Sequence, residues 1–339
     1  MAEPAVITHP QVDPAWLERL REDILEPDLP IVDPHHHLWE RGGRYFLDEL
    51  LADTGSGHNV VATVFVQCHY AYRTSGPEEL RPVGETEFVT RVAEEAEERN
   101  AATRACAGIV GFADLQLGER VDPVLQAHVE AAGGRFRGIR RLTARDPAFK
   151  THLPMLPSHM LSDPAFRQGF ARLAKFGLSY DAWVYHPQIA EVTDLARAFP
   201  EVPIVLDHAG TPLGLGPYRG RQDEVFRAWR ADMAELAKCA NVHVKLGGLA
   251  MVFNGFDFHE APLPPSSGEL ALRWRPYIES CIELFGVRRC MFESNFPVDK
   301  GMVSYPVLWN AFKRLAAGAS TDEKAALFHD TAAGFYRLA

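Results

Sequence analysis

The chain has 339 residues, of which 47% are hydrophobic and 24% charged, the balance of an ordinary globular protein. Its formal net charge is -10 and it has no basic run, which argues against nucleic acid and anionic membrane surfaces as partners. The start has no signal-peptide pattern, no apolar run approaches the roughly 20 residues of a membrane helix, and the five cysteines lack a C-x-x-C pair, so we expect a cytoplasmic protein with reduced cysteines.

An N-terminal helix is expected at residues 10–26. Apolar residues recur there at helical spacing, and Asp13-Pro14 offers an N-cap followed by proline at the first helical position. We expect residues 1–30 to form an extension that packs across the outside or bottom of one domain, residues 31–339.

Short apolar runs alternate with helical segments along the rest of the chain. Strands are expected at 31–39, 60–69, 106–113, 136–142, 178–184, 203–208, 242–246 and 289–295. Helices are expected at about 85–100, 121–132, 164–176, 189–198, 224–238, 269–285, 305–317 and 322–337. This alternation predicts a parallel sheet closed as a (β/α)8 barrel, with long loops at 70–84, 143–162 and 247–267.

The first strand runs into three consecutive histidines. With a period of two, Asp33, His35 and His37 share one face and His36 points the other way. Two imidazoles two residues apart can reach one small ion, and nitrogen ligands of this kind suit zinc and similar divalent metals. The alternative is a strand end with solvated histidines.

Polar residues crowd at the expected carboxyl ends of the strands, where barrel enzymes place their sites. They are His35, His37, Gln67, His69, Arg140, Arg141, His186, His208, Lys245, Glu293 and Asn295. His208 is followed by Ala209-Gly210, where a ligand can approach the backbone closely.

Lys245 is expected to point into the barrel. The apolar residues of its strand, Val242, Val244 and Leu246, share the opposite face, which should pack on the helices. A lysine inside a barrel is costly unless it meets an anion or a bound group, so it either contacts substrate or forms a structural ion pair.

Together these motifs resemble the amidohydrolase-related superfamily, in the amidohydrolase 2 branch that contains sugar-acid lactonases and 2-pyrone-4,6-dicarboxylate lactonase. The resemblance rests on motifs that occur in this order: D-x-H-x-H from Asp33 to His37, G-I-R ending at Arg140, H-P-Q from His186, L-D-H-x-G from Leu206 to Gly210, V-K-L around Lys245 and S-N-F-P from Ser294 to Pro297.

The resemblance implies a metal or substrate site at His35, His37 and His208, with zinc or manganese as the metal. The family usually has an aspartate as general base where this chain has Asn295, and a neutral amide neither accepts a proton at neutral pH nor binds a metal as strongly. Glu293 and Asp299 are the candidate bases in its place. We therefore expect weak or partial metal occupancy, and catalysis without metal stays open.

The expected activity is the hydrolysis of a lactone or related cyclic ester. His208, Glu293, Asp299 and Lys245 would be catalytic, and the substrate-binding residues would be Gln67, Arg73, Arg140, His186 and Asn295. A cluster of Lys245, Arg140 and Arg73 in an acidic protein predicts a small substrate with a carboxylate, unless the acids of the chain itself offset the charge.

Two other classes of function stay open at this point. One is a metal-dependent non-oxidative decarboxylase, which uses a similar barrel, and the other is a barrel that binds a ligand without turnover. The oligomeric state is also open, with a homo-oligomer as one option.

Overall fold

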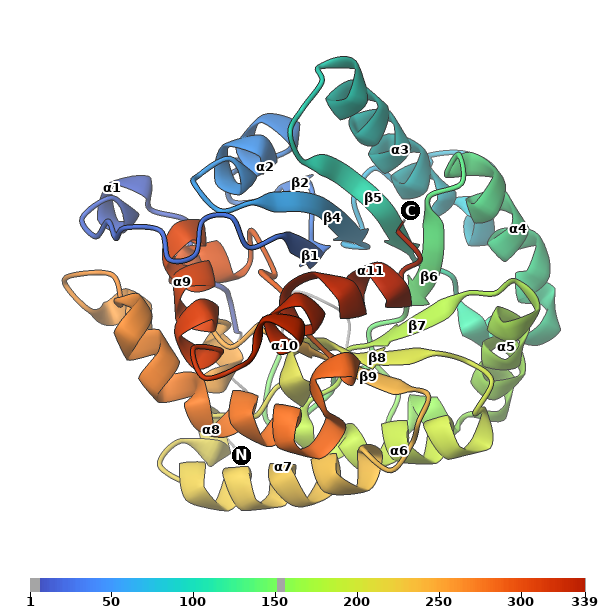
Figure 1. Ribbon diagram of the computed structural model, residues 1–339. Helices are drawn as coiled ribbons and strands as arrows, with labels where there is room; N and C mark the ends of the chain where they lie inside the picture. The colour runs from blue at the N-terminus through green and yellow to red at the C-terminus, as the bar shows by residue number, and fades with distance from the viewer. Residues whose placement is uncertain (1–6, 151–155, 339) are drawn as a thin grey trace.

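The computed structural model describes residues 7–150 and 156–338. Eight strands form one sheet in the order β1-β4-β5-β6-β7-β8-β9-β10, with every neighbouring pair parallel. The sheet curls into a barrel that helices surround (Figure 1), which confirms the predicted (β/α)8 fold. The strands are β1 Ile31–His36, β4 Val60–Val66, β5 Arg104–Gly111, β6 Phe136–Arg140, β7 Ser179–Ala182, β8 Ile204–Leu206, β9 Val242–Leu246 and β10 Cys290–Phe292.

The barrel closes through backbone contacts just beyond β10. The Asn295 amide donates to the His35 carbonyl at 2.9 Å, and the His37 amide donates to the Phe296 carbonyl at 2.8 Å. These contacts join the ends of β1 and β10 that carry the predicted site residues.

The surrounding helices match the predicted ones except near the two ends of the chain, and α2, between β3 and β4, was not predicted. The predicted helix 322–337 consists of α10, a π-helical turn at Ala326–Asp330, and α11. The helices are α2 Leu47–Thr54, α3 Val83–Glu98, α4 Asp122–Ala131, α5 Pro164–Lys175, α6 Ile189–Ala198, α7 Gln222–Leu236, α8 Ser267–Phe285, α9 Tyr305–Leu315, α10 Thr321–Ala325 and α11 Thr331–Phe335.

The barrel interior is an apolar core that the C-terminal segment completes. Strand residues such as Val32, Val64 and Met291 form one cluster with Ala332 and Tyr336. In Figure 1 α11 lies across the barrel opening, and Thr331 donates to the carbonyl of Val287, just before β10 begins. The C-terminal segment therefore covers the end where the strands start and leaves the other end for the site.

The predicted helix over residues 10–26 is wrong. Only α1, Pro14–Leu17, is helical, with the Asp13 side chain accepting from the Trp16 amide at 3.1 Å as a cap. Further along, the segment bonds to distant parts of the chain: Leu25 N donates to Asn310 Oδ1 at 2.9 Å. These tertiary contacts override a helical periodicity, which is only a weak preference.

A β-hairpin that was not predicted from the sequence follows the three histidines. Its strands are β2 Trp39–Glu40 and β3 Arg44–Tyr45, which pair antiparallel. Gly42 and Gly43, with φ of 65° and 146°, make the turn because glycine adopts positive φ without steric cost.

Within the described ranges, no helix combines the length and the apolar character needed to cross a membrane. All five cysteines are buried and unbridged, as predicted. Residues 1–6 of the predicted extension and 151–155 of the predicted loop 143–162 lie outside the described residues.

Candidate active site

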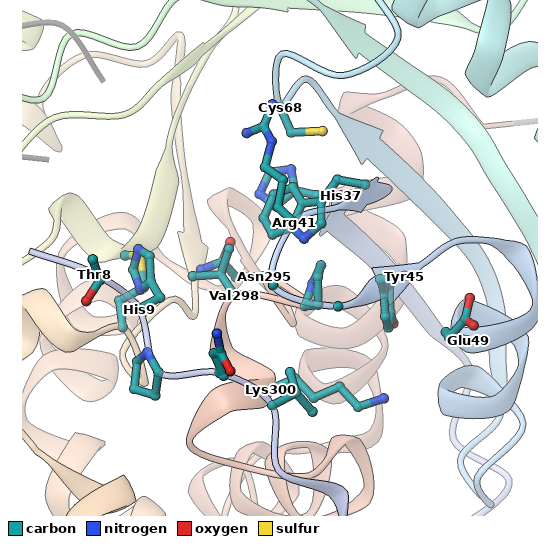
Figure 2. Close-up of a pocket in the computed structure, with 18 of the residues that line it drawn as sticks. Thr8, His9, His37, Arg41, Tyr45, Glu49, Cys68, Asn295, Val298 and Lys300 are labelled. Carbon is teal, nitrogen blue, oxygen red and sulfur yellow. The ribbon is translucent and has the colours of Figure 1, made fainter. Parts of the chain in front are cut away.

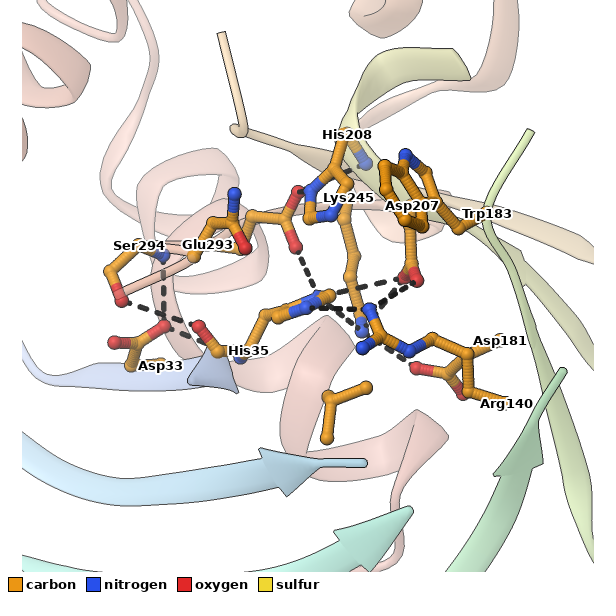
Figure 3. Close-up of polar contacts among 12 residues, drawn as sticks. Asp33, His35, Arg140, Asp181, Trp183, Asp207, His208, Lys245, Glu293 and Ser294 are labelled. Carbon is orange, nitrogen blue, oxygen red and sulfur yellow. Dashed lines mark hydrogen bonds and ion pairs between the residues drawn. The ribbon is translucent and has the colours of Figure 1, made fainter. Parts of the chain in front are cut away.

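A buried polar cluster lies at the carboxyl ends of the strands (Figure 3). Each of its side chains is at most 4% exposed, so their interactions are little screened by water. The cluster consists of His35 on β1, Arg140 on β6, Asp181 on β7, Asp207 and His208 after β8, Lys245 on β9 and Glu293 after β10.

Glu293 joins two of the predicted histidines. Its Oε2 lies 2.8 Å from His35 Nδ1, and its Oε1 lies 2.7 Å from His208 Nδ1. The His208 backbone amide also donates to Oε1, at 3.0 Å. Burial alone would raise the pKa of Glu293, but the two histidines lower it to about 2. Glu293 is therefore a carboxylate. Its Oε1 accepts from His208 Nδ1, which leaves His208 Nε2 as an acceptor, and its Oε2 lies within ion-pair distance of His35 Nδ1.

This arrangement corrects the role predicted for Glu293. A carboxylate with so low a pKa, and with one oxygen accepting two hydrogen bonds from His208, is a poor general base. It is well placed to orient His208, which lines the pocket described below. Because His208 Nδ1 faces Glu293, Nε2 is the ring nitrogen available to a ligand.

His35 is held from two sides. Its Nε2 lies 3.3 Å from Arg140 Nη1, and its Nδ1 lies 3.1 Å from Lys245 Nζ. Burial, followed by the charge of Lys245, puts the pKa of His35 well below 6.5, so the ring is neutral.

Lys245 forms the structural ion pair that was the alternative to substrate contact. Its Nζ lies 2.7 Å from Asp181 Oδ2 and 3.0 Å from Asp207 Oδ1. Burial would lower the pKa of Lys245, but the two carboxylates together raise it. Lys245 is fully buried, so we correct its predicted catalytic role to an internal one.

Asp181 and Asp207 were missed as site residues. The signal for Asp181 was available, because its apolar neighbours Tyr180 and Ala182 share the other face of β7 and pack in the main core. Asp207 lies in the L-D-H motif, where the prediction singled out the neighbouring His208 instead.

The residues that could hold a metal ion differ from the predicted set. In the part of the chain that is described, His35, His208 and Glu293 present ligand atoms within 4.8 Å of one another. His37 is not in this group. Its Nδ1 lies 2.7 Å from the Val66 carbonyl, and its ring stacks on Trp39 at 5.1 Å. Two imidazoles and one carboxylate are a donor set that fits zinc or a similar divalent ion.

Asn295 and Asp299 form a separate pair beside the cluster. Asn295 Nδ2 donates to Asp299 Oδ1 at 2.8 Å, and the Ala250 amide donates to Asp299 Oδ2 at 3.1 Å. Burial raises the pKa of Asp299 well above its usual value. Asp299 therefore positions Asn295, and its predicted role as base is not favoured because both oxygens already accept.

A pocket of about 640 Å³ borders the cluster (Figure 2). His37, Arg140, His208 and Asn295 line it together with apolar side chains. The latter are Trp39, Leu142, Trp183 and Met251. The size and the mixed lining are those of a small-molecule site.

The N-terminal arm, which we define as residues 7–14, also lines this pocket, between Thr8 and Pro14. Its start is tied down where the Ile7 amide donates to the Lys150 carbonyl at 2.7 Å. The His9 ring meets Phe253 edge-on at 5.4 Å. The expectation that this segment packs on the outside or bottom of the barrel is wrong for the arm, because it borders the pocket at the carboxyl ends of the strands.

Three predicted substrate-binding residues do not line the pocket. Arg73 pairs with Glu87, and its side chain is 38% exposed. His186 Nδ1 accepts from the Leu213 amide at 3.2 Å, and the ring packs against Tyr218. Gln67 is fully buried and contributes its backbone carbonyl, which accepts from Arg140.

Asp33 departs from the predicted common face with His35 and His37. The pairing of β1 with β4 is irregular between Asp33 and His36, which breaks the period-two alternation. Asp33 accepts instead from the Ser294 amide at 2.9 Å and the Tyr305 hydroxyl at 3.0 Å, and burial raises its pKa to about 6. It anchors the segment after β10.

Comparison with known proteins gives matches over nearly the whole chain. A sequence model of the family described as Amidohydrolase matches residues 32–338. The chain is 35% identical over 335 residues to the uncharacterised protein y4mH of Sinorhizobium fredii, covering 92% of this chain and 99% of that one. It is 31% identical over 240 residues to an L-fucono-1,5-lactonase of Burkholderia multivorans, covering 68% of this chain and 72% of the lactonase.

Two crystal structures of an amidohydrolase from Burkholderia multivorans also match, each with a TM-score of 0.70. They cover 91% of this chain and 99% of the other. One holds HEPES, at 25% identity, and the other holds zinc, at 24% identity.

Proposed function

Since the chain belongs to the amidohydrolase family, we propose that it is a hydrolase that opens the ring of a lactone or a related cyclic ester. The similarity to an L-fucono-1,5-lactonase supports a substrate of this class. The observation that carries the proposal is the pairing of His208 Nδ1 with Glu293 at 2.7 Å, on a histidine that lines the pocket.

His208 is the proton acceptor in this proposal. Its Nε2 takes a proton from a water molecule whose oxygen attacks the lactone carbonyl carbon, and Glu293 stabilises the imidazolium that forms. Arg140, which also lines the pocket, is a donor that can stabilise the negative charge on the carbonyl oxygen. The ring C–O bond then breaks, and the leaving oxygen takes the proton from His208.

The same region could instead hold a divalent metal, in which case His208 would be a ligand and not the proton acceptor. His35, His208 and Glu293 would be its ligands, and a bound zinc or manganese ion would polarise the carbonyl and lower the pKa of water. Arg140, His37 and Asn295 lie outside this set of ligands and remain available to the substrate.

The test is acid release in a pH-stat from a panel of five- and six-membered lactones, both neutral and carboxylated. We expect hydrolysis of at least one by the wild type, and a loss of about 10²–10⁴-fold in His208→Ala. His329→Ala, at a partly exposed histidine that pairs with Asp330, is the matched control. Carbon dioxide release from an aromatic carboxylate without lactone hydrolysis would replace the proposal with a decarboxylase, and lactone binding without turnover would replace it with a binding protein.

A further inference from the structure

We infer that the substrate carries an anionic group and that Arg41, on the turn between β2 and β3, binds it at the rim of the pocket. This inference rests on the proposed lactone hydrolysis and adds to it the chemical class of the substrate. Lys245 and Arg140 first suggested an anionic substrate. Their charges alone do not support one, because Asp181 and Asp207 form ion pairs with them in the buried cluster.

Four cationic side chains line the pocket, and their partners differ. They are Arg41, Arg44, Arg140 and Lys300. Arg44 lies 3.1 Å from Asp48, Lys300 lies 2.7 Å from Asp53, and Arg140 lies 3.8 Å from Asp207. Arg41 has no carboxylate within ion-pair distance among residues 7–150 and 156–338, so its charge is the one that the protein leaves for a ligand.

The lining as a whole is positive although the protein carries a net charge of -10. Glu49 is the one acidic residue among the described side chains that line the pocket, and it already lies 3.6 Å from Arg44. A cleft lined by one sign of charge raises the local concentration of ligands of the opposite sign. The pocket lining therefore attracts an anionic ligand, although the net charge of the whole protein repels anions.

Arg41 is also held in place before any ligand arrives. Its Nη2 donates to the His69 carbonyl at 2.6 Å, and its guanidinium lies 5.8 Å from the centre of the Trp39 ring. One bond to a carbonyl leaves other N–H groups of the guanidinium free to grip a carboxylate.

The position of Arg41 connects the rim to the reacting end of the pocket. Trp39 stacks on His37 with 13° between the ring planes, and Figure 2 shows Arg41 and His37 on the same side of the cavity. A ligand whose anionic group meets Arg41 therefore extends along Trp39 toward the polar cluster.

The test compares a carboxylated lactone with its neutral carboxamide in wild type, Arg41→Met and Arg230→Met. Arg230→Met is the control, because Arg230 lies on α7, is not part of the pocket lining, and pairs with Glu283 at the surface. We expect the wild type to prefer the acid in kcat/KM, and Arg41→Met to reduce that preference about tenfold through KM. Arg41→Lys should keep part of the preference, and Arg230→Met should keep all of it.

An unchanged preference in Arg41→Met, or an equal loss in Arg230→Met, would overturn the inference while leaving lactone hydrolysis intact. If no lactone is hydrolysed, the proposed function fails, and calorimetric titration with the ring-opened dicarboxylate still tests Arg41. A Kd about tenfold weaker in Arg41→Met alone supports the anion site, and equal Kd values in all three proteins contradict it.

Discussion

At the scale of single residues, the amide of Asn295 counters part of the effect of burial, which raises the pKa of the neighbouring Asp299. It donates to Asp299 Oδ1 at 2.8 Å, and Asp299 is fully buried. A carboxylate introduced at this position would face Asp299 directly, and two carboxylates at this separation cannot both ionise without a large cost.

Asn295→Asp should therefore destabilise the protein increasingly as the pH rises. The double variant Asn295→Asp, Asp299→Asn restores one amide and one carboxylate to the pair and should recover most of the lost Tm. It should also retain more metal after dialysis than the wild type, because an added charged ligand strengthens divalent metal binding. Thermal scans between pH 5 and pH 9 and elemental analysis check both results. A double variant with no more metal than wild type would mean that a carboxylate at position 295 does not reach the metal.

At the scale of elements, helix α3 positions the segment after β4. Glu85 on α3 accepts from the Cys68 amide at 3.0 Å and the Tyr70 amide at 2.8 Å, and Cys68 and His69 line the pocket. Burial raises the pKa of Glu85 from 4.5 to about 7. In the folded protein the group keeps its proton up to about pH 7, whereas in the unfolded chain it loses the proton near pH 4.5.

Between these values the folded state binds more protons, so this group makes stability fall as the pH rises. A shift of this size corresponds to a loss on the order of 3 kcal/mol across the window. Urea unfolding of wild type and Glu85→Gln from pH 4 to pH 8 should show a shallower decline in the variant. Parallel curves for the two proteins would mean that Glu85 titrates normally.

The N-terminal arm is the second element whose position matters for the site. It passes close to Gly301, where a Cβ atom would lie 2.4 Å from the Pro10 carbonyl oxygen. Gly301→Ala should therefore displace the arm and raise KM about tenfold, with kcat and Tm little changed. At Gly318 a Cβ atom would meet nothing within 4 Å, so Gly318→Ala is the control.

Hydrogen exchange should show faster exchange of residues 7–14 in Gly301→Ala than in Gly318→Ala. A KM equal to that of wild type together with faster exchange would show that the arm lines the pocket without contacting the substrate.

At the scale of the whole molecule, a chain of contacts runs through the barrel from the C-terminal segment to the site. Tyr336, in the core below the site, donates to Asp181 Oδ2 at 2.7 Å, and Asp181 pairs with Lys245. Lys245 lies 3.1 Å from His35, so the last helix and the first strand are linked through buried polar groups.

Lys245→Met should therefore cost stability, because it leaves Asp181 and Asp207 buried without their cation. The loss expected for breaking a buried pair is about 3–5 kcal/mol in urea unfolding. Lys238→Met, at a mostly exposed lysine that pairs with Glu235, should change stability by less than about 1 kcal/mol. A stable Lys245→Met protein with impaired turnover would return Lys245 to the catalytic group.

The barrel could be predicted from sequence because the residues of each strand show the apolar pattern of a buried strand. That His35, His208 and Glu293 meet could be predicted for the same reason: barrel topology brings strand ends together whatever the loops do. Arg73 and the N-terminal arm were misplaced because their positions depend on tertiary contacts that spacing does not encode, such as the pairing of Arg73 with Glu87. Alternation placed His37 with His35, but it does not show how far apart their ligand atoms lie.

In the proposed lactone hydrolysis, Glu293 acts through His208. This role is tested by kcat/KM of Glu293→Gln on the best lactone of the panel. The control is Glu283→Gln, at a glutamate that forms a surface pair with Arg230. A glutamine cannot stabilise the imidazolium, so we predict a loss of about 10²–10⁴-fold in Glu293→Gln, in a protein whose near-ultraviolet circular dichroism matches wild type, and no loss in Glu283→Gln. A folded Glu293→Gln protein with kcat/KM within about threefold of wild type, less than 1 kcal/mol in transition-state stabilisation, would contradict the account.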